Sequence, residues 1–291
     1  MIVILTALDV EQNAVLEHLI DLEMYEHDKG TLFDVGTIAE HPGHRVAVGI
    51  TGAGTTTAAA LTERARAEFS PAAMMFVGVA GGLRQKTAVG DVVVATKVYS
   101  YQGGRSEDDR FLVRPRSWEL SHRVDQLAHR LCRRHQWRGF LPDHARATPP
   151  DVHFGAIAVG DVLLDSTRSD LAQRLHTSYN DAIAVEMEGS GFAHAAALGD
   201  QVPAVVIRGI SDHADGHKAD ADHAGGQARA VANAAAFAVA LAVSLEPESR
   251  SAPEDPVTSD PAPTTITNTL VARGNAHVEN QIGTQFNGGL R

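Results

Sequence analysis

The sequence predicts an α/β fold, a three-layer sandwich built around a mixed, largely parallel central sheet. Six apolar runs have the length of strands, and several are continuously apolar, as expected for strands covered on both faces. Helical patterns fill most of the gaps between them, and such alternation is typical of α/β folds. A hairpin pattern surrounds His41-Pro42-Gly43. These observations predict one large domain in residues 1–245.

The elements follow from these patterns in chain order. The predicted strands are apolar runs, at residues 2–7, 73–79, 91–98, 154–159, 182–187 and 203–210. The hairpin strands are expected at residues 31–38 and 44–50. The predicted helices occupy the stretches between strands, at residues 10–22, 55–69, 117–135, 167–176, 188–199 and 223–244.

Composition narrows the class of protein. The 291 residues are 44% hydrophobic, which is enough for a sizeable core. A formal net charge of -11 argues against a nucleic-acid binder, which normally presents a basic face. The one cysteine, Cys132, excludes an intrachain disulfide and a cysteine-rich zinc site, and it fits a reducing compartment. We therefore expect a cytoplasmic protein that binds no nucleic acid.

Two apolar stretches could be mistaken for targeting or membrane segments. Residues 1–12 lack a basic leader and a cleavage pattern, so we interpret them as a first strand and not as a signal peptide. The stretch Ala230 to Leu245 is short for a membrane span, rich in alanine and interrupted by Asn233. It predicts a helix packed in the core, and no membrane association.

The composition changes sharply after Leu245. Residues 246–263 are dominated by Pro, Ser, Asp and Glu, so they cannot bury enough apolar surface to fold and predict a disordered, semi-stiff linker. Residues 264–291 carry spaced apolar residues among Asn, Gln, Thr and Gly, with little charge. Such a segment can stack identical strands through amide ladders, so we expect a short β-prone tail; the alternative is a disordered tail.

Three acidic residues each follow a different apolar run. Glu11 follows the first run, Glu188 closes the run that begins at residue 182, and Asp212 follows the last. In an α/β sheet the ligand crevice lies beyond the carboxyl ends of the strands. Carboxyl groups delivered there can act as acid, as base and as acceptor of sugar hydroxyls on one small molecule.

A family resemblance becomes specific in an ordered set of motifs. Any one glycine motif would be weak, but the set resembles the methylthioadenosine/adenosylhomocysteine nucleosidases and the wider nucleoside phosphorylase/nucleosidase superfamily, over about residues 1–245. The motifs are Ala7-Leu8-Asp9-Val10-Glu11, Thr51-Gly52-Ala53-Gly54, Val77-Gly78-Val79-Ala80-Gly81-Gly82-Leu83, Val185-Glu186-Met187-Glu188 and Ile210-Ser211-Asp212.

The resemblance implies a role for each matching residue. Cleavage of an N-glycosidic bond needs an acid at the purine and a nucleophile on the opposite face of an oxocarbenium-like sugar. Asp212 is implied to protonate N7, for which a raised pKa is expected, and Glu11 to orient and deprotonate water. Glu188 would accept hydrogen bonds from the ribose hydroxyls. The other implied binding residues are Met187 at the sugar face, Ser211 beside Asp212, and Gly54, Val79, Ala80 and Gly81 in the glycine segments.

Some residues admit a second interpretation. Glu186 lies two residues before Glu188, and a strand would place both on one face. Glu186 is either a second sugar-side group or, as we prefer, a supporting partner of a base such as Arg208. Glu11 could instead be an ordinary first-turn helix acid, and Asp212 a simple cap. The polar stretch 213–223 has the residue types of a metal site, but no fixed spacing unites them, so we expect a solvated loop, no metal and no cofactor.

The nucleophile is expected to be water. Phosphorylases of this superfamily carry an early Gly-Asp-Pro-x-Arg loop for phosphate, whereas this chain has Leu5-Thr6-Ala7-Leu8-Asp9 and no arginine before Arg45. A multiply charged nucleophile would be poorly held without that guanidinium. A purine nucleoside phosphorylase remains one alternative function, and phosphate-dependent product would distinguish it.

Several differences from the nucleosidase motifs bear on the identity of the substrate. Val79 stands where the nucleosidases carry serine, and Leu163 where they carry a base-stacking phenylalanine. The segment from residue 99 to residue 118 holds four arginines, Arg114 among them, which suit phosphate or form a solvated loop. These traits, and the stretch from Gly209 to Lys218, resemble superfamily domains that serve as effectors in immune-type proteins. We therefore expect an ATP-depleting enzyme of antiphage immunity, and keep a methylthioadenosine/adenosylhomocysteine nucleosidase as the alternative.

The tail suggests a second function. Asn268-Thr-Leu270, Gly274-Asn275 and Asn280-Gln281-Ile282-Gly283 resemble bacterial amyloid signalling motifs. The resemblance implies that a partner protein with a like motif gathers the enzyme and activates it. Relatives are commonly dimeric or larger, so we expect a homo-oligomer. A rival of another class is a catalytically idle sensing or adaptor module, which binding without turnover would support.

Overall fold

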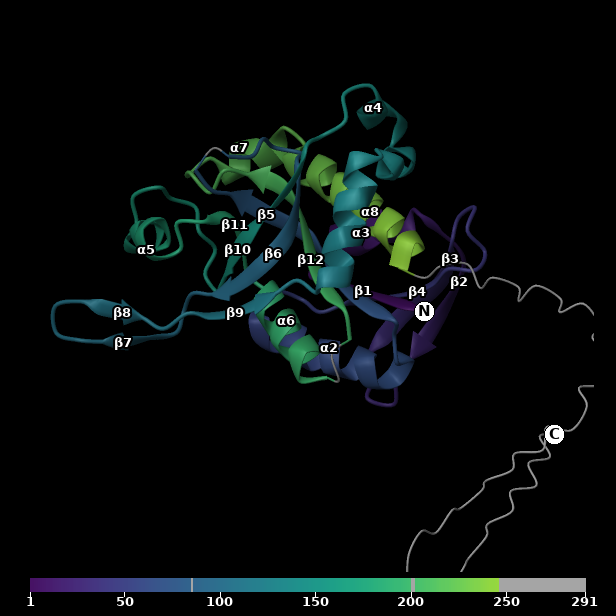
Figure 1. The fold of residues 1–291 in the computed structure, drawn as a ribbon, viewed down its shortest axis with the longest axis horizontal. Coiled ribbons are helices and arrows are strands. Elements are labelled where there is room, and N and C mark those ends of the chain that lie inside the picture. The colour runs from purple at the N-terminus through teal and green to yellow at the C-terminus, as the bar shows by residue number, and fades with distance from the viewer. Residues whose placement is uncertain (85, 200–201, 246–291) are drawn as a thin grey trace, which may run out of the picture. The chain divides into compact units, whose positions relative to one another are not determined.

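The computed structural model describes residues 1–84, 86–199 and 202–245. The predicted linker, residues 246–263, and the predicted tail, residues 264–291, lie outside the described residues. Within the described part, helices and strands alternate around a mixed sheet (Figure 1), so the prediction of an α/β fold with a mixed sheet is confirmed.

The main sheet of the described residues has ten strands in the order β11-β10-β6-β12-β5-β1-β4-β3-β2, with β9 added on β6. Strands β1, β4, β5 and β12 run parallel to one another, while β6 lies antiparallel to β12. The strands of this sheet are β1 (Ile2–Thr6), β2 (Leu19–Glu26), β3 (Leu32–Ile38), β4 (Arg45–Ile50), β5 (Ala73–Gly82), β6 (Val92–Ser100), β9 (Arg116–Glu119), β10 (Val152–Val159), β11 (Ala182–Glu186) and β12 (Ala204–Asp212).

The sheet closes on itself at one end, which the sequence does not predict. Strand β11 pairs with β10 and also, antiparallel, with the end of β5, where Ala184 faces Gly82 and Val185 faces Gly81. The five strands β5, β12, β6, β10 and β11 therefore form a ring. A side chain at Gly82 would meet Thr87 Oγ1 at 2.6 Å, so glycine permits this crowded closure.

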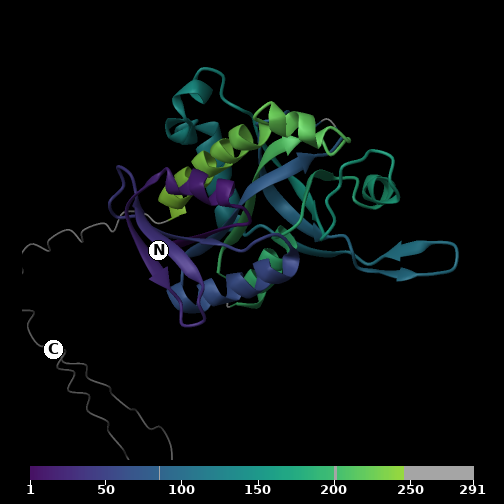
Figure 2. The same ribbon diagram turned by 180° about the vertical axis from the view of Figure 1, so that it is seen from behind.

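Helices cover both faces of the sheet (Figures 1 and 2). On one face, α1, α3 and α8 pack over a core that includes Val15, Leu131 and Phe237; on the other, α2 and α6 pack together. Helix α8 is the one described helix with the length and apolarity of a membrane span, but 72% of that stretch is buried in this core. The helices are α1 (Asp9–Leu16), α2 (Thr55–Phe69), α3 (His122–Arg133), α4 (Asp143–Arg146), α5 (Asp170–Ser178), α6 (Gly189–Leu198), α7 (Lys218–His223), α8 (Gly226–Leu245) and the 3-10 helix η1 (Gln136–Phe140).

Three predicted helices are wrong at their ends. The first, residues 10–22, ends at Leu16, and the chain then becomes edge strand β2 because pairing with β3 overrides its local pattern. The helix predicted at 117–135 begins only at His122, where the Ser121 side chain caps it, and its first residues form β9 instead. Before α8, Gly225 has φ +75° and separates the short helix α7.

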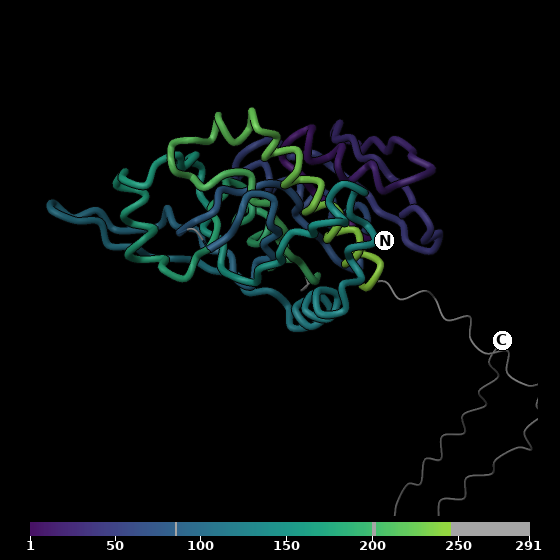
Figure 3. Tube along the Cα trace, turned by 90° about the horizontal axis from the view of Figure 1, so that it is seen from above, coloured from purple at the N-terminus to yellow at the C-terminus, as the bar shows by residue number. Residues whose placement is uncertain are grey.

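A two-stranded arm, β7 (Gly104–Ser106) and β8 (Phe111–Val113), was not predicted. It projects away from the main sheet in all three views (Figures 1, 2 and 3). Arg114 follows β8 and is exposed to solvent. The arm therefore carries part of the arginine-rich segment, including Arg105, whereas Arg116 begins β9 of the main sheet.

Candidate functional site

A small cavity of about 150 Å³ lies at the carboxyl ends of β1, β5, β11 and β12. We call it the carboxylate pocket, because four carboxyl side chains line it. Of the twelve predicted site residues, ten line this pocket. Gly54 does not line it but donates its N–H to Glu188, which does. Arg114 does not line it. The lining residues are Ala7, Leu8, Glu11, Ala53, Val79, Ala80, Gly81, Val162, Leu163, Leu164, Val185, Glu186, Met187, Glu188, Ser211, Asp212, Lys218 and Gln227.

Glu11 is fixed by the turn between β1 and α1. As the third residue of α1 it reaches back, so Oε2 accepts the backbone N–H groups of Ala7 (2.8 Å) and Leu8 (3.0 Å). Its Oε1 accepts the N–H of Val79 on β5 (2.9 Å). Three backbone donors thus hold this buried carboxylate at the floor of the pocket, which is more than a first-turn helix acid requires.

Glu186 and Glu188 converge on one guanidinium. Strand β11 ends at Glu186, and Glu188 is already the cap of α6, so the two do not share a strand face as the sequence suggested. Arg208 on β12 is fully buried; its Nη2 pairs with Glu186 Oε2 and lies 3.4 Å from Glu188 Oε2. Glu186 also accepts the N–H of Gly189 (2.9 Å). Glu186 therefore has the contacts of a supporting group.

Opposing contributions from burial and from neighbouring charges set the pKa of Glu188. Burial raises its pKa, Arg208 lowers it and Glu186 raises it again, with a net pKa of about 7. The opposite oxygen, Oε1, accepts the N–H of Gly54 at 3.1 Å. Gly54 has φ +105°, a conformation that favours glycine, and this aims its N–H across the pocket.

The pKa of Asp212 is shifted in the opposite direction to that of Glu188. Burial raises its pKa, but hydrogen bonds from Ser211 and Ala214 and the ammonium of Lys218 outweigh burial, so the net pKa lies below the ordinary value. Oδ1 accepts the N–H of Ala214 (2.8 Å), and Oδ2 accepts from Ser211 Oγ (2.7 Å) and Lys218 Nζ (3.1 Å). The expectation of a raised pKa for Asp212 is wrong in this structure, because its polar neighbours stabilise the carboxylate.

The N-terminus of α2, beside the pocket, already holds an anionic group. Thr55 N donates to Asp161 Oδ1 at 2.8 Å, and Thr55 Oγ1 donates to the same oxygen at 2.9 Å. Helix N-termini are ready-made anion sites, and here an acidic side chain of the chain itself takes the position.

Two basic residues of the site, Arg208 and Lys218, are not among the site residues predicted from the sequence. Arg208 was considered only as a possible partner of Glu186, yet its charge also faces Glu188 and Glu11. Its place in an otherwise apolar strand was the available signal, because a lone buried cation needs anionic partners. Lys218 was not singled out, since it belongs to the polar stretch 213–223 that gave no fixed spacing. Among the described residues, no three His, Cys, Asp or Glu side chains are grouped to hold a metal.

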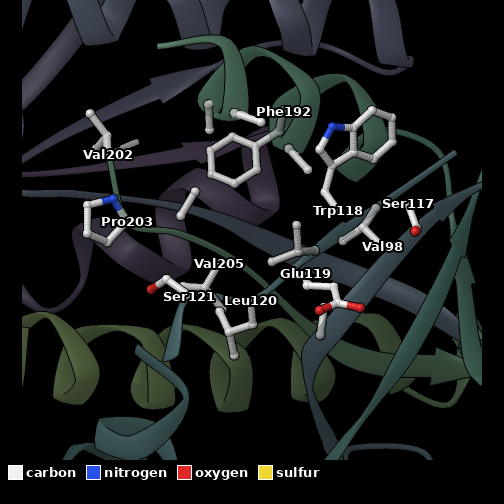
Figure 4. Close-up of a pocket in the computed structure, with 16 residues that line it drawn as sticks. Val98, Ser117, Trp118, Glu119, Leu120, Ser121, Phe192, Val202, Pro203 and Val205 are labelled. Carbon is white, nitrogen blue, oxygen red and sulfur yellow. The ribbon is translucent and has the colours of Figure 1, made fainter. Parts of the chain in front are cut away.

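A second cavity, of about 390 Å³, lies between β6, β9, β12 and α6 (Figure 4). Phe192, Trp118 and Val205 line it (Figure 4). Its one acidic side chain among the described residues is Glu119, which pairs at the surface with Lys97 (3.6 Å). It offers no paired acid and base, so we assign the chemistry to the carboxylate pocket.

Comparison with known proteins agrees with this geometry. The family model described as "Phosphorylase superfamily" matches residues 1–243. The ATP nucleosidase Cap17 of Escherichia coli strain KTE188 is 29% identical over 185 residues, which is 59% of this chain and 36% of Cap17. This chain therefore spans about a third of the length of that relative. The 5'-methylthioadenosine/S-adenosylhomocysteine nucleosidase of Mycobacterium tuberculosis is 31% identical over 208 residues, 62% of this chain and 73% of that enzyme.

Solved structures share the fold. The methylthioadenosine/adenosylhomocysteine nucleosidase of Neisseria meningitidis, in complex with methylthio-immucillin-A, superposes with a TM-score of 0.68 at 22% identity, covering 84% of this chain and 98% of that one. A futalosine hydrolase of Helicobacter pylori gives 0.67 at 22% identity, with 82% and 96% covered. At this level of identity, these likenesses concern the fold alone.

Proposed function

Because this chain belongs to the phosphorylase superfamily, we propose that it is a purine N-ribosyl hydrolase that cleaves an adenine nucleoside or nucleotide. The observation that carries the proposal is the convergence of Glu11, Glu188 and Asp212, from three distant parts of the chain, on one small pocket. The two curated relatives described above, both of them nucleosidases by name, support the same reaction class.

The proposed reaction divides the work between two ends of the substrate. Asp212, carrying a proton, gives it to N7 as the C1′–N9 bond breaks and its electron pair passes to the purine. Water adds to C1′ of the oxocarbenium-like ribosyl group, and Glu11 takes the proton that this water loses. The ribose hydroxyls donate to Glu188, and Met187 packs against the sugar. The products are adenine and the free ribosyl compound.

Water is the nucleophile that this pocket favours. Four carboxyl groups and one ammonium, that of Lys218, line the described pocket, so an entering phosphate would meet mostly negative charge. The nearby N-terminus of α2 already holds Asp161. Both observations oppose phosphorolysis, for which a trianion must be bound beside the sugar.

The substrate that we prefer is ATP or another adenine nucleotide. The similarity to the ATP nucleosidase Cap17 supports this choice, and the effector-like sequence of residues 209–218 favours a role in antiphage immunity. The similarity to the mycobacterial nucleosidase supports methylthioadenosine or adenosylhomocysteine as the second candidate. Arg114 is exposed at the base of the arm and does not line the pocket, so we propose that it would contribute to phosphate binding only from a second subunit of a homo-oligomer.

The test is chromatography of adenine release from adenosine, methylthioadenosine, adenosylhomocysteine and ATP, each with and without phosphate. We expect adenine and a free ribosyl product at rates that phosphate does not change, with ATP the best substrate. Cleavage of methylthioadenosine with ATP intact would overturn the nucleotide preference. Formation of ribose 1-phosphate would make the protein a phosphorylase, and binding without turnover would make it a sensing module.

We further propose that residues 264–291 drive assembly of the enzyme with a partner that carries a like motif. This proposal rests on the amyloid-type motif in the sequence. The isolated 264–291 peptide should form cross-β fibrils with the characteristic spacing of about 4.7 Å in fibre diffraction. A peptide that remains soluble and unstructured under all conditions would end this part of the account.

A further inference from the structure

We propose that Lys218 is a displaceable counter-ion of Asp212, holding its carboxylate ionised until a purine enters and then moving to Asp222. The inference rests on the proposed function, in which Asp212 must carry a proton to reach N7. Lys218 acts through Asp212 and is therefore a positioning residue. Its displacement would couple protonation of the acid to the arrival of the base.

The first observation is that both lone pairs of Asp212 Oδ2 are engaged by donors, whereas Oδ1 accepts a single hydrogen bond. Oδ1 accepts from Ala214 N, and Oδ2 accepts from both Ser211 Oγ and Lys218 Nζ. Purine N7 is an acceptor, and two acceptors cannot bond without a proton between them. For Oδ2 to carry the proton that N7 receives, one of its two donors must leave. The side chain of Lys218 is the more mobile of the two, because four rotatable bonds separate its ammonium from the backbone.

The second observation is the size of the pocket. Its volume of about 150 Å³ is small beside the roughly 300–1,000 Å³ typical of small-molecule sites. Lys218 lines this volume, and its side chain is 23% exposed, so it lies at the border between pocket and solvent. Withdrawal of that side chain enlarges the space directly beside Asp212, where the proposed purine must lie.

The third observation is a second partner within reach. Lys218 begins α7, and Asp222 lies one turn further along the same helix, with its Oδ2 3.7 Å from Lys218 Nζ. The side chain of Asp222 is 37% exposed, against 5% for Asp212. An ammonium that leaves the buried carboxylate thus keeps an ionic partner at the surface and needs no movement of the helix.

The electrostatic consequence follows from the neighbours of Asp212. The other charged groups that line or back the pocket are Glu11 on α1, Glu186 and Glu188 at the end of β11, and Arg208 on β12. Of these, Arg208 is engaged with Glu186 and Glu188, so Lys218 is the cation in direct contact with Asp212. When Lys218 leaves and a purine displaces water, both changes raise the pKa of Asp212, which takes one proton from solvent onto Oδ2.

Carbon-13 titration of the Asp212 carboxyl in the full chain tests the counter-ion directly, without any need for turnover. The D212N variant assigns the signal. In K218M the pKa of Asp212 should rise by about one unit, since the opposite charge is lost, and K218R should restore the wild-type value. K97M, which removes a surface lysine paired with Glu119, is the matched control and should leave the titration unchanged. An Asp212 titration that is identical in K218M and wild type would overturn the proposal.

Calorimetry in buffers of different ionisation enthalpy tests the displacement. Carbocyclic adenosine keeps N7 but has no glycosidic bond that can form an oxocarbenium ion, and 7-deazaadenosine lacks the N7 acceptor. Binding of the first to wild-type protein near pH 7.5 should take up about one proton more than binding of the second. D222N should weaken binding of carbocyclic adenosine severalfold, because the second partner of Lys218 is lost, and should affect binding of 7-deazaadenosine less. Equal proton uptake by the two ligands would contradict the proposal, whereas the proposed function fails separately if no member of the substrate panel releases adenine.

Discussion

At the scale of single residues, the site holds four carboxyl groups close together in one small volume. Arg208 offsets Glu186 and Glu188, and Lys218 offsets Asp212, so each acid has a distinct environment. Here the pKa of Glu188 is raised to about 7, while that of Asp212 is lowered.

The raised pKa of Glu188 predicts a pH dependence of ribose binding. Below pH 7 its carboxyl is mostly protonated, and above pH 7 it is ionised and accepts hydrogen bonds from hydroxyls more strongly. The affinity for 7-deazaadenosine should therefore increase by about tenfold as the pH rises through 7. This ligand has no N7, so protonation of Asp212 does not contribute to the change. Calorimetric titrations between pH 6 and pH 8 measure the effect.

The E188Q variant is the control for that experiment. Glutamine keeps the size of the side chain and cannot ionise, so its affinity should be lower and independent of pH over the same range. An unchanged pH dependence in E188Q would place the titrating group elsewhere in the pocket.

The sequence predicts the acids of the pocket better than its cations. Glu11, Glu188 and Asp212 each follow an apolar run. Because the carboxyl ends of the strands meet at one edge of an α/β sheet, their positions predict that the three side chains lie close together. Lys218 follows Asp212 by only six residues, but its contact depends on the turn at Ala214, which has φ +50°, and on α7.

At the scale of elements, the buried core elements were predictable and the peripheral ones were not. The apolar runs that become β1, β5 and β12, and the alanine-rich α2, have local preferences that agree with their tertiary environment. Edge strand β2 and the β7–β8 arm have no such pattern, because strand pairing rather than burial defines them. Ring closure by β11 depends on two glycines whose role only the packing reveals.

The contact between β12 and α8 gives an element-scale prediction. A Cβ at Gly209 would overlap the backbone carbonyl of Ala230 on α8, and neither backbone can move without disturbing the core. The variant G209A should therefore lower the free energy of unfolding by about 1–3 kcal/mol, as overpacked cores generally do. Urea denaturation followed by circular dichroism measures the change.

A glycine in an open turn is the matched control. Gly43 has no atom within 4 Å of the position of a Cβ, so G43A should change the free energy of unfolding by less than about 0.5 kcal/mol. If G209A proves as stable as G43A, the close approach of β12 to α8 is not required by the fold.

At the scale of the whole molecule, residues 1–245 hold every described element and every lining residue of the carboxylate pocket. The division into a catalytic domain, a linker at 246–263 and an assembly segment at 264–291 remains a proposal from composition. The pocket itself draws on α1, β5, β11, β12 and α7, so its formation requires the complete sheet.

A chain that ends at Leu245 should keep the fold and the proposed activity. Thermal unfolding of residues 1–245 should occur within about 2 °C of the full-length midpoint, because no described core residue is removed. Its rate of adenine release should equal that of the unassembled full-length protein. A truncated protein that is unfolded or insoluble would show that the region after Leu245 completes the domain.

The central claim is that Asp212 and Glu11 act on one glycosidic bond, and adenine release by matched variants tests it most directly. With the best substrate of the panel, the account predicts that D212N lowers kcat by about 10²–10⁴-fold and that E11Q also lowers it strongly, while circular dichroism shows that both variants remain folded. Adenine release at the wild-type rate by folded D212N would contradict the account.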